Sequence, residues 1–171
     1  MVLTLTGCGG SSGDDISTYT YSSELDIKNL DSSDADDQCP LRAIHAVIDG
    51  LMKTDKKGNI TYGIAKSEEV SEDGLVHTYK LRKDVRWDNG DLVTAHDFVY
   101  AWQRLANPET AADYCYMIDM VQGYDAVADG SADPSTLGIT AVDDQTLQID
   151  LTYDCPYFEE IMAFPATFPV R

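Results

Sequence analysis

The sequence predicts a mixed fold of the α/β (α+β) class, in which helices alternate with antiparallel hairpins. Apolar residues recur every three or four positions in 40–52 and 94–106, whereas they alternate with polar residues in 74–82 and 146–152. The first spacing is typical of a helix with one buried face, and the second is typical of a strand with one buried face. Interleaved helices and hairpins favour an α/β or α+β architecture, and the order of the elements alone does not select one fold.

The N-terminal third is expected to hold one strand, one loop and one helix. Tyr and Thr alternate in 18–22, which predicts a short strand, and the acidic, Ser-rich segment 32–38 is typical of a loop. Pro40 suits the first turn of a helix over 40–52, and 55–59 then turns the chain. This helix would bury Leu41, Ile44, Val47, Ile48 and Leu51.

The middle of the chain carries the most regular pattern. Asn89–Gly90 favours a tight turn, because both residues tolerate positive φ. Thr94 and Asp97 have the spacing of a capping box, which predicts that a helix begins there. A second helical region over 111–128 is expected to break near Gly123. The apolar stripe of the first of these helices consists of Phe98, Trp102 and Leu105.

The C-terminal third is expected to hold a hairpin and a last helix. The strands of the hairpin would be 138–142 and 146–152, joined across Asp143–Asp144. Asp154 can cap a helix over 156–164. The buried face of the second strand would carry Leu147, Ile149 and Leu151.

Charge and length restrict the class of protein. The 171 residues include 12 Lys and Arg against 30 Asp and Glu, a formal net charge of -18. Such an acidic surface repels nucleic acids, whose binding needs basic side chains, and it disfavours anionic lipid surfaces. The length suggests one domain, or slightly more, with a sizeable core.

The N-terminus predicts attachment to a membrane by a lipid. No run of about 20 apolar residues could span a bilayer, but residues 5–8 resemble the lipobox that ends a bacterial lipoprotein signal. We therefore expect a remnant signal over 1–8, a lipid on Cys8 and a flexible tether over 9–17. A basic n-region and most of the apolar segment are missing, and the alternative is a thiol on a frayed terminus.

No pattern predicts a catalytic, metal or cofactor site, and we expect no cofactor. A Ser/His/Asp triad stays open at this point, because its members are brought together only by folding. The other cysteines are odd in number and lack a CxxC pair, which leaves small buried side chains or a single bridge as the alternatives. They are Cys39, Cys115 and Cys155. His45, His77 and His96 lack the spacing of metal ligands. An acidic cluster is expected to form a solvated turn and comprises Glu68, Glu69, Glu72 and Asp73.

Tyrosine is the dominant aromatic residue, with ten copies. An aromatic ring with a hydroxyl suits a surface that half buries a ligand or another lobe, although a single tyrosine is more often part of the core or its rim. Five tyrosines cluster in the C-terminal half, namely Tyr114, Tyr116, Tyr124, Tyr153 and Tyr157.

Residues 81–102 carry the most specific pattern of the sequence. It combines Leu81, Arg82, a turn with Trp87, Asp88, Asn89 and Gly90, and the run Val93, Thr94, Ala95, His96, Asp97, Phe98, Val99, Tyr100, Ala101, Trp102. This block closely resembles that of the oligopeptide-binding proteins, the family 5 solute receptors of ABC importers. The resemblance extends from Cys8 to Arg171 and covers about the first third of such a receptor.

The resemblance implies a periplasmic-binding-protein-like fold in which two lobes close around a peptide and present it to an ABC permease. It assigns 18–50 to the start of lobe one, 51–165 to an additional subdomain of that lobe, and 166–171 to the return to lobe one. By this assignment the second lobe is missing. We therefore expect the chain alone to bind peptides weakly, because one wall of the cleft is water.

The resemblance also implies ligand-binding residues. Tyr114 is similar to the tyrosine with which these receptors touch the peptide, with packing between helices as the alternative. Asp36, Asp37 and Gln38 align with a segment whose backbone pairs with the extended peptide. Ser32 replaces the proline usual before this segment, and the loop is unusually acidic, which would favour cationic peptides.

The expected function is that of a monomeric, lipid-anchored peptide receptor on the outer face of the cell membrane, or in the periplasm, with ABC permease subunits as partners. Two alternatives remain open. One is a secreted hydrolase domain, and the other is a tethered interaction lipoprotein or decayed fragment with no transport role. The length and sequence of the peptide, and whether the solute is a peptide at all, also remain open.

Overall fold

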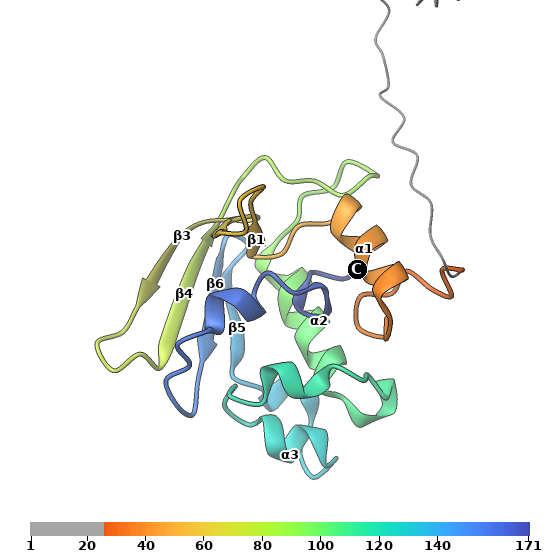
Figure 1. Cartoon of the computed structure of the whole chain (residues 1–171). Coiled ribbons are helices and arrows are strands. Elements are labelled where there is room, and N and C mark those ends of the chain that lie inside the picture. Colours follow the sequence, from red (N-terminus) through yellow and green to blue (C-terminus); the bar gives the residue numbers. More distant parts are fainter. Residues whose placement is uncertain (1–25) are drawn as a thin grey trace, which may run out of the picture.

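Figure 1 shows a twisted antiparallel sheet, which has four strands, with helices and turns gathered on one side of it. The computed structural model describes residues 26–171, so the predicted strand 18–22, the tether and the Cys8 lipobox lie outside the described residues. The strands follow the order β3-β4-β6-β5, and every neighbouring pair is antiparallel. They are β3 (Ala65–Val70), β4 (Val76–Leu81), β5 (Ile139–Asp143) and β6 (Thr146–Asp150). The predicted mixed fold class is confirmed.

One face of this sheet is buried and contributes its side chains to the hydrophobic core. Tyr79 of β4 lies opposite Leu147 of β6, and His77 lies opposite Ile149. All four side chains are buried. Helix α2 (Ala95–Ala106) packs against β5 and β6. The alternation predicted for the two central strands is thus confirmed.

Helix α2 begins and packs as its sequence predicts. The Thr94 N–H donates to Asp97 Oδ2 at 2.7 Å and closes the capping box. Phe98, Trp102 and Leu105 are fully buried. These contacts fix α2 as the central helix of the molecule.

Helix α1 ends earlier than the sequence pattern predicts. It spans Gln38–Val47, and the next residue already has extended backbone angles. The chain then pairs with a neighbouring segment, because the Gly63 N–H donates to the Leu51 carbonyl at 2.9 Å and the Ile64 N–H donates to the Gly50 carbonyl at 2.8 Å. Met52 already begins a strand, so the helix cannot continue to this residue. The prediction of a helix to residue 52 is therefore wrong.

A short antiparallel hairpin follows α1. Its strands are β1 (Met52–Thr54) and β2 (Ile60–Tyr62). The Asp55 carboxylate holds the turn by accepting hydrogen bonds from the N–H groups of Lys57 and Asn59. The turn predicted here is confirmed, whereas the two short strands were not predicted.

The helical region predicted for 111–128 is confirmed only in part, because it contains short turns and one short helix. Backbone pairing interrupts it, because the Gln122 N–H donates to the Asp150 carbonyl at 2.8 Å. The predicted break at Gly123 is confirmed, since this glycine has a φ of 82°, which L residues rarely adopt. The segment forms the 3-10 turn η2 (Cys115–Ile118) and helix α3 (Tyr124–Ala128). The 3-10 turn η1 (Pro108–Thr110) precedes it, and the 3-10 turn η3 (Pro134–Thr136) follows it.

The C-terminal hairpin is confirmed, but the last helix is shorter than predicted. Helix α4 covers only Phe158–Ile161, and the 3-10 turn η4 (Pro165–Thr167) follows it. The N-cap of α4 is Tyr157, and no side chain caps the helix. Asp154 lies instead against Gly74 in the turn between β3 and β4. The prediction that Asp154 caps this helix is therefore wrong.

Candidate functional site

Tyr114 lies directly before η2 and faces the segment that precedes α1. Its half-buried ring makes an edge-on contact with Phe164, with ring centroids 5.1 Å apart, and a tilted contact with Tyr116 at 6.2 Å. Its exposed hydroxyl donates to the carbonyl oxygen of Asp36 over a long distance of 3.5 Å. The structure thus brings together two sequence-predicted site residues that lie 78 positions apart.

The other two predicted residues of the segment begin helix α1. Asp37 is the N-cap, and its Oδ1 accepts a hydrogen bond from the Cys39 N–H at 3.1 Å. Gln38 is the first helical residue, so the predicted loop ends one residue earlier than expected. Among the described residues, the backbone N–H groups of Asp36, Asp37 and Gln38 donate to no acceptor. The segment therefore presents backbone donors that an incoming chain could use.

A bidentate ion pair holds this segment to the rest of the molecule. Both guanidinium NH2 groups of Arg104, on α2, donate to the Asp31 carboxylate, at 2.6 and 2.5 Å. The hydrogen bonds from Arg104 hold the pKa of Asp31 below its ordinary value. Ala35 adds an apolar contact by packing with Ile44 of α1 and Phe168. The backbone beside Tyr114 is therefore fixed from both sides.

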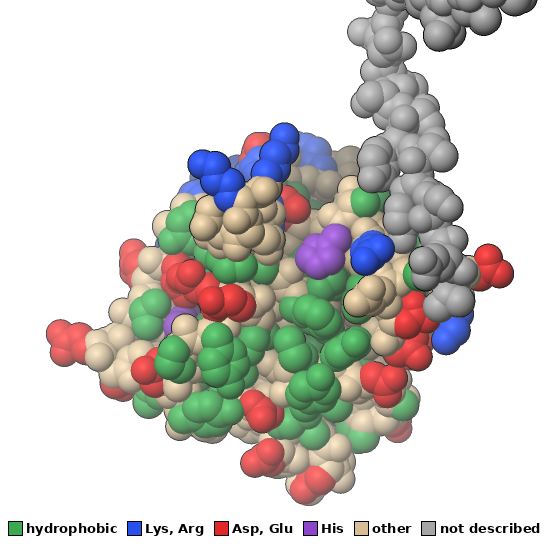
Figure 2. All heavy atoms as spheres, in the orientation of Figure 1, with side chains coloured by type: hydrophobic (Ala, Val, Ile, Leu, Met, Phe, Trp, Pro, Cys, Tyr) green, Lys and Arg blue, Asp and Glu red, His purple; other side chains and the backbone are tan. Residues whose placement is uncertain are grey.

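Four tyrosines form a surface that we call the aromatic face: Tyr114, Tyr116, Tyr153 and Tyr157. The last three are about half exposed, at 57%, 46% and 56%. The Tyr153 hydroxyl donates to Asp119 Oδ1 at 2.9 Å, and this bond raises the pKa of Tyr153 to about 12. Figure 2 shows hydrophobic side chains gathered on this side of the molecule, over α4, η4 and η2. Tyr124, the fifth tyrosine of the sequence cluster, is buried instead.

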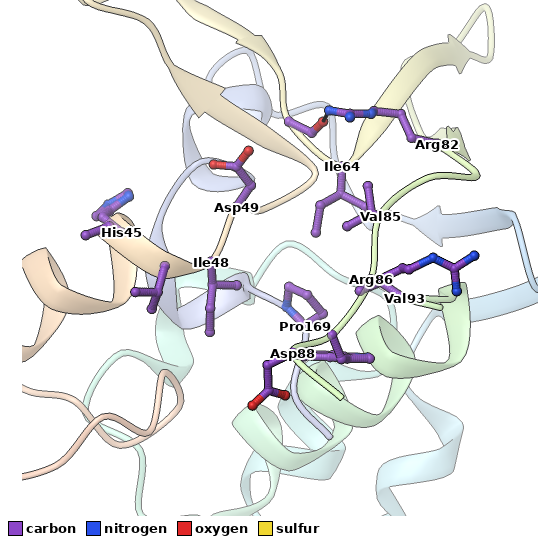
Figure 3. Close-up of a pocket in the computed structure, with 14 residues that line it drawn as sticks. His45, Ile48, Asp49, Ile64, Arg82, Val85, Arg86, Asp88, Val93 and Pro169 are labelled. Atoms are coloured by element: carbon purple, nitrogen blue, oxygen red, sulfur yellow. Dashed lines mark hydrogen bonds between the residues drawn. The ribbon is translucent and has the colours of Figure 1, made fainter. Parts of the chain in front are cut away.

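A groove of about 720 Å³ opens on another side, between the end of α1, the segment 82–88 and the C-terminal residues. Figure 3 shows His45 and Arg86 pointing away from its centre. The centre is apolar and is lined by Ile48, Ile64, Val85 and Pro169. No sequence pattern indicated this groove, because its walls come from segments that lie far apart in the sequence.

Glu68 and His77 form a buried polar pair that lies against α4. His77 Nδ1 lies 2.7 Å from Glu68 Oε1, and the two side chains are only 9% and 6% exposed. The His77 ring also contacts Phe158, with ring centroids 4.6 Å apart. Burial would raise the pKa of Glu68, but the hydrogen bond with His77 lowers it below the ordinary value. The pair therefore joins strands β3 and β4 by a short polar contact from which water is largely excluded.

The interpretation of Glu68 as part of a solvated acidic turn is wrong. Glu68 belongs to strand β3, which the sequence did not predict, and its side chain faces the covered side of the sheet. Glu72 and Asp73 do lie in the exposed turn that follows.

Replacing Glu159 by Gln is expected to raise the melting temperature at pH 7 by about 1–2 °C. Burial and the Glu68 carboxylate raise the pKa of Glu159, so its ionised form is less favourable in the folded protein than in the unfolded chain. For a raised carboxyl pKa, the folded state binds the proton more tightly, and stability is lost as pH rises through that pKa. The benefit of the substitution should therefore fade as the pH falls toward about 4.

Scanning calorimetry between pH 4 and pH 8 measures this dependence. Glu160→Gln is the matched control, because it removes the same charge from the next, exposed position. Equal changes in melting temperature for both variants would contradict the coupling between Glu159 and Glu68.

The described part of the chain contains no cluster of His, Cys, Asp and Glu side chains that could hold a metal ion. Cys155 is buried, as expected, while Cys39 and Cys115 are partly exposed. Across residues 26–171, no helix is long and apolar enough to cross a membrane.

Solved structures place this fold in a known class. An oligopeptide ABC transporter substrate-binding domain from Bacillus anthracis superposes with a TM-score of 0.81 and 41% identity, over 83% of this chain and 27% of that one. Listeria monocytogenes OppA bound to peptide gives 0.81 and 40%, over 83% and 28%. The fold is therefore that of the N-terminal part of a periplasmic binding protein.

Sequence comparison identifies the family. Residues 59–171 match the family described as bacterial extracellular solute-binding proteins, family 5 Middle, and the chain belongs to this family. A dipeptide-binding protein of Lactococcus lactis is 34% identical over 97% of this chain and 30% of its own length. The family predicted from the block 81–102 is confirmed. The chain spans less than a third of the length of these relatives.

Proposed function

We propose that this chain forms one wall of the peptide-binding cleft in the extracytoplasmic receptor of an ABC importer. The observation that carries the proposal is the position of the Tyr114 hydroxyl over the Asp36 carbonyl, beside three backbone N–H groups without acceptors among the described residues. The names of the relatives support it, since they describe proteins that bind oligopeptides and dipeptides. The chain acts as a receptor and not as an enzyme.

An extended peptide would bind to this wall as an added strand. Its carbonyls would accept hydrogen bonds from the N–H groups of the Asp36–Gln38 segment, and Tyr114 would contact its backbone or a side chain. Backbone pairing of this kind is independent of side-chain identity, so affinity and sequence preference are set by different groups. The Tyr114 side chain contacts this backbone directly, since its hydroxyl lies 3.5 Å from the Asp36 carbonyl oxygen.

The division of the receptor into lobes is part of the proposal. Residues 18–50 begin lobe one, 51–165 form its additional subdomain, and 166–171 return to lobe one. Closure of two lobes about a hinge would enclose the peptide and present it to the permease. The apolar groove beside Pro169 supports this division, because it offers a surface on which further polypeptide could pack.

The proposed receptor is monomeric and lipid-anchored at Cys8. The physical reason for an anchor is that it keeps a binding protein close to the membrane-embedded permease, while the tether over 9–17 leaves it free to bind solute. Mass spectrometry of the membrane-bound protein tests this part. A Cys8 that carries no diacylglycerol would rule it out.

Replacing Tyr114 by Ala is expected to weaken the binding of pentaalanine at least tenfold, because the variant removes a ring contact and a hydroxyl from the peptide wall. Affinity of the chain alone should be weaker than about 10 μM, roughly 7 kcal/mol, since one side of the cleft is open. The measurement is therefore an NMR titration at millimolar peptide, following the amide signals of Asp36, Asp37 and Gln38.

Two variants control this experiment. Tyr100→Ala removes an exposed tyrosine from α2 that takes no part in the wall, and it should bind pentaalanine normally. Tyr114→Phe keeps the ring packed on Phe164 and loses only the hydroxyl, so it should give an intermediate affinity. Unchanged amide signals in all three predicted residues, at saturating peptide, would refute the proposed wall.

A further inference from the structure

The C-terminal part of this chain is uniformly acidic. Residues 105–170 contain 12 Asp and Glu and not one Lys, Arg or His, although the whole chain has 12 Lys and Arg. Figure 2 shows the same division in space: Lys and Arg lie over the upper part of the visible surface, and the lower part carries only acidic, hydrophobic and uncharged side chains. A mobile cation is therefore attracted to the side of the molecule that carries the aromatic face.

Asp119 is the carboxylate placed within the aromatic face. Its Oδ1 accepts the Tyr153 hydroxyl at 2.9 Å, and its backbone N–H donates to the Tyr116 carbonyl at 3.2 Å. Among the described residues it has no Lys or Arg partner, and its side chain is exposed. Cys155 and, to a smaller extent, Asp119 raise the pKa of Tyr157, which places this tyrosine within the field of the same carboxylate.

We propose that the aromatic face and Asp119 recognise a basic side chain of the bound peptide, so that the receptor prefers peptides containing arginine or lysine. This inference rests on the proposed function, because it concerns a peptide already paired with the segment beside Tyr114. The tyrosine rings adjoin that segment through Tyr114, whose ring lies 6.2 Å from the ring of Tyr116. The face thus begins where the peptide backbone would lie.

The chemistry of the face fits a guanidinium or an ammonium group. The negative faces of tyrosine rings attract a cation, and a planar guanidinium also stacks on them. Asp119 supplies the opposite charge, and Tyr153 keeps one of its oxygens oriented while leaving the other for a ligand. A glutamate or aspartate side chain would be repelled by the same carboxylate. The face therefore favours basic side chains of the peptide and disfavours acidic ones.

Three alanine-based pentapeptides, with arginine, glutamate or alanine at the centre, test the proposal by NMR titration of the complete chain. The arginine peptide is expected to bind about tenfold more tightly than the glutamate peptide at low salt, with the alanine peptide between them. Only the arginine peptide should shift the amide signals of Tyr116, Asp119 and Tyr157 strongly. The preference should shrink at about 500 mM salt, which screens exposed charges.

Asp119→Asn is the decisive variant, because asparagine still accepts the Tyr153 hydrogen bond but carries no charge. It should reduce the arginine-to-glutamate preference about threefold. Asp88→Asn is the matched control: it removes one exposed carboxylate from the groove on another side of the molecule and should leave the preference unchanged.

The outcomes separate this inference from the proposed function. If all three peptides shift Asp36, Asp37 and Gln38 and bind equally, the wall is real and the basic preference is wrong. An arginine preference that survives Asp119→Asn also overturns the inference, because another surface must then cause it. If no peptide shifts the 36–38 signals, the proposed function itself fails.

Discussion

Replacing Trp102 by Ala is expected to lower the free energy of unfolding by about 3–5 kcal/mol. The side chain is fully buried in the centre of the core, and its indole N–H donates to the Thr167 carbonyl at 3.0 Å. The variant leaves a large cavity next to α2 and a buried carbonyl without its partner. Both effects act on stability and not on specificity, because Trp102 does not reach the surface.

Urea denaturation monitored by circular dichroism measures this loss. Tyr100→Ala is the control on the same helix, where an exposed side chain should cost less than about 1 kcal/mol. Trp102→Phe should fall between the two, since it refills part of the cavity but cannot donate to Thr167. A Trp102→Ala protein as stable as the parent would show that the core is not organised around α2.

Replacing Gly50 by Ala is expected to destabilise the fold by about 3 kcal/mol or more, because the added methyl group cannot be accommodated. A Cβ at this position would lie 2.4 Å from the Met162 carbonyl oxygen and 2.5 Å from the Phe168 ring. The first of these atoms belongs to the backbone, and the Gly50 carbonyl is itself bound to the Ile64 N–H. Relieving the clash would therefore move the chain at Gly50 away from Met162 and Phe168.

Gly58→Ala isolates the steric part of this effect. Gly58 has a φ of 86°, but no atom lies within 4 Å of the place that an alanine Cβ would occupy. Alanine there should therefore cost only the conformational strain of about 1–2 kcal/mol. Thermal unfolding of the two variants gives the comparison. Equal losses of stability would mean that the close approach at Gly50 is not the constraint described.

Elements specified by adjacent residues could be predicted from the sequence. The capping box at Thr94 and Asp97 and the alternation in β4 and β6 depend on contacts within one element or between neighbouring strands, and the structure confirms them. Strand β3 was not predicted, because its charged residues do not alternate with apolar ones. One of them, Glu68, is nevertheless buried beside His77.

Elements decided by distant backbone bonds could not be predicted. The chain after α1 is extended where the carbonyl of Gly50 binds the Ile64 N–H, and the chain beside the predicted break at Gly123 pairs through the bond from the Gln122 N–H to the Asp150 carbonyl. No pattern of neighbouring residues indicates which distant backbone group will form the hydrogen bond. Apolar spacing therefore overestimated both helices.

Only part of the candidate site could be predicted from the sequence. Tyr114 and the 36–38 segment follow from the family resemblance, but their proximity depends on the folding of a segment that separates them by 78 positions. The tyrosine cluster indicated a ligand surface, yet the sequence could not separate buried Tyr124 from the exposed Tyr116 and Tyr157. The pairing of Asp119 with Tyr153 joins two turns and has no sequence signature.

The contact between Met52 and Met162 has a topological consequence. The Met52 N–H donates to the Met162 carbonyl at 3.3 Å. The two ends of the segment 52–162 therefore lie side by side. A segment whose ends already touch can be inserted into a host fold, or circularly permuted, with little change in loop-closure entropy. The unit carrying the aromatic face therefore begins and ends at one place in the fold.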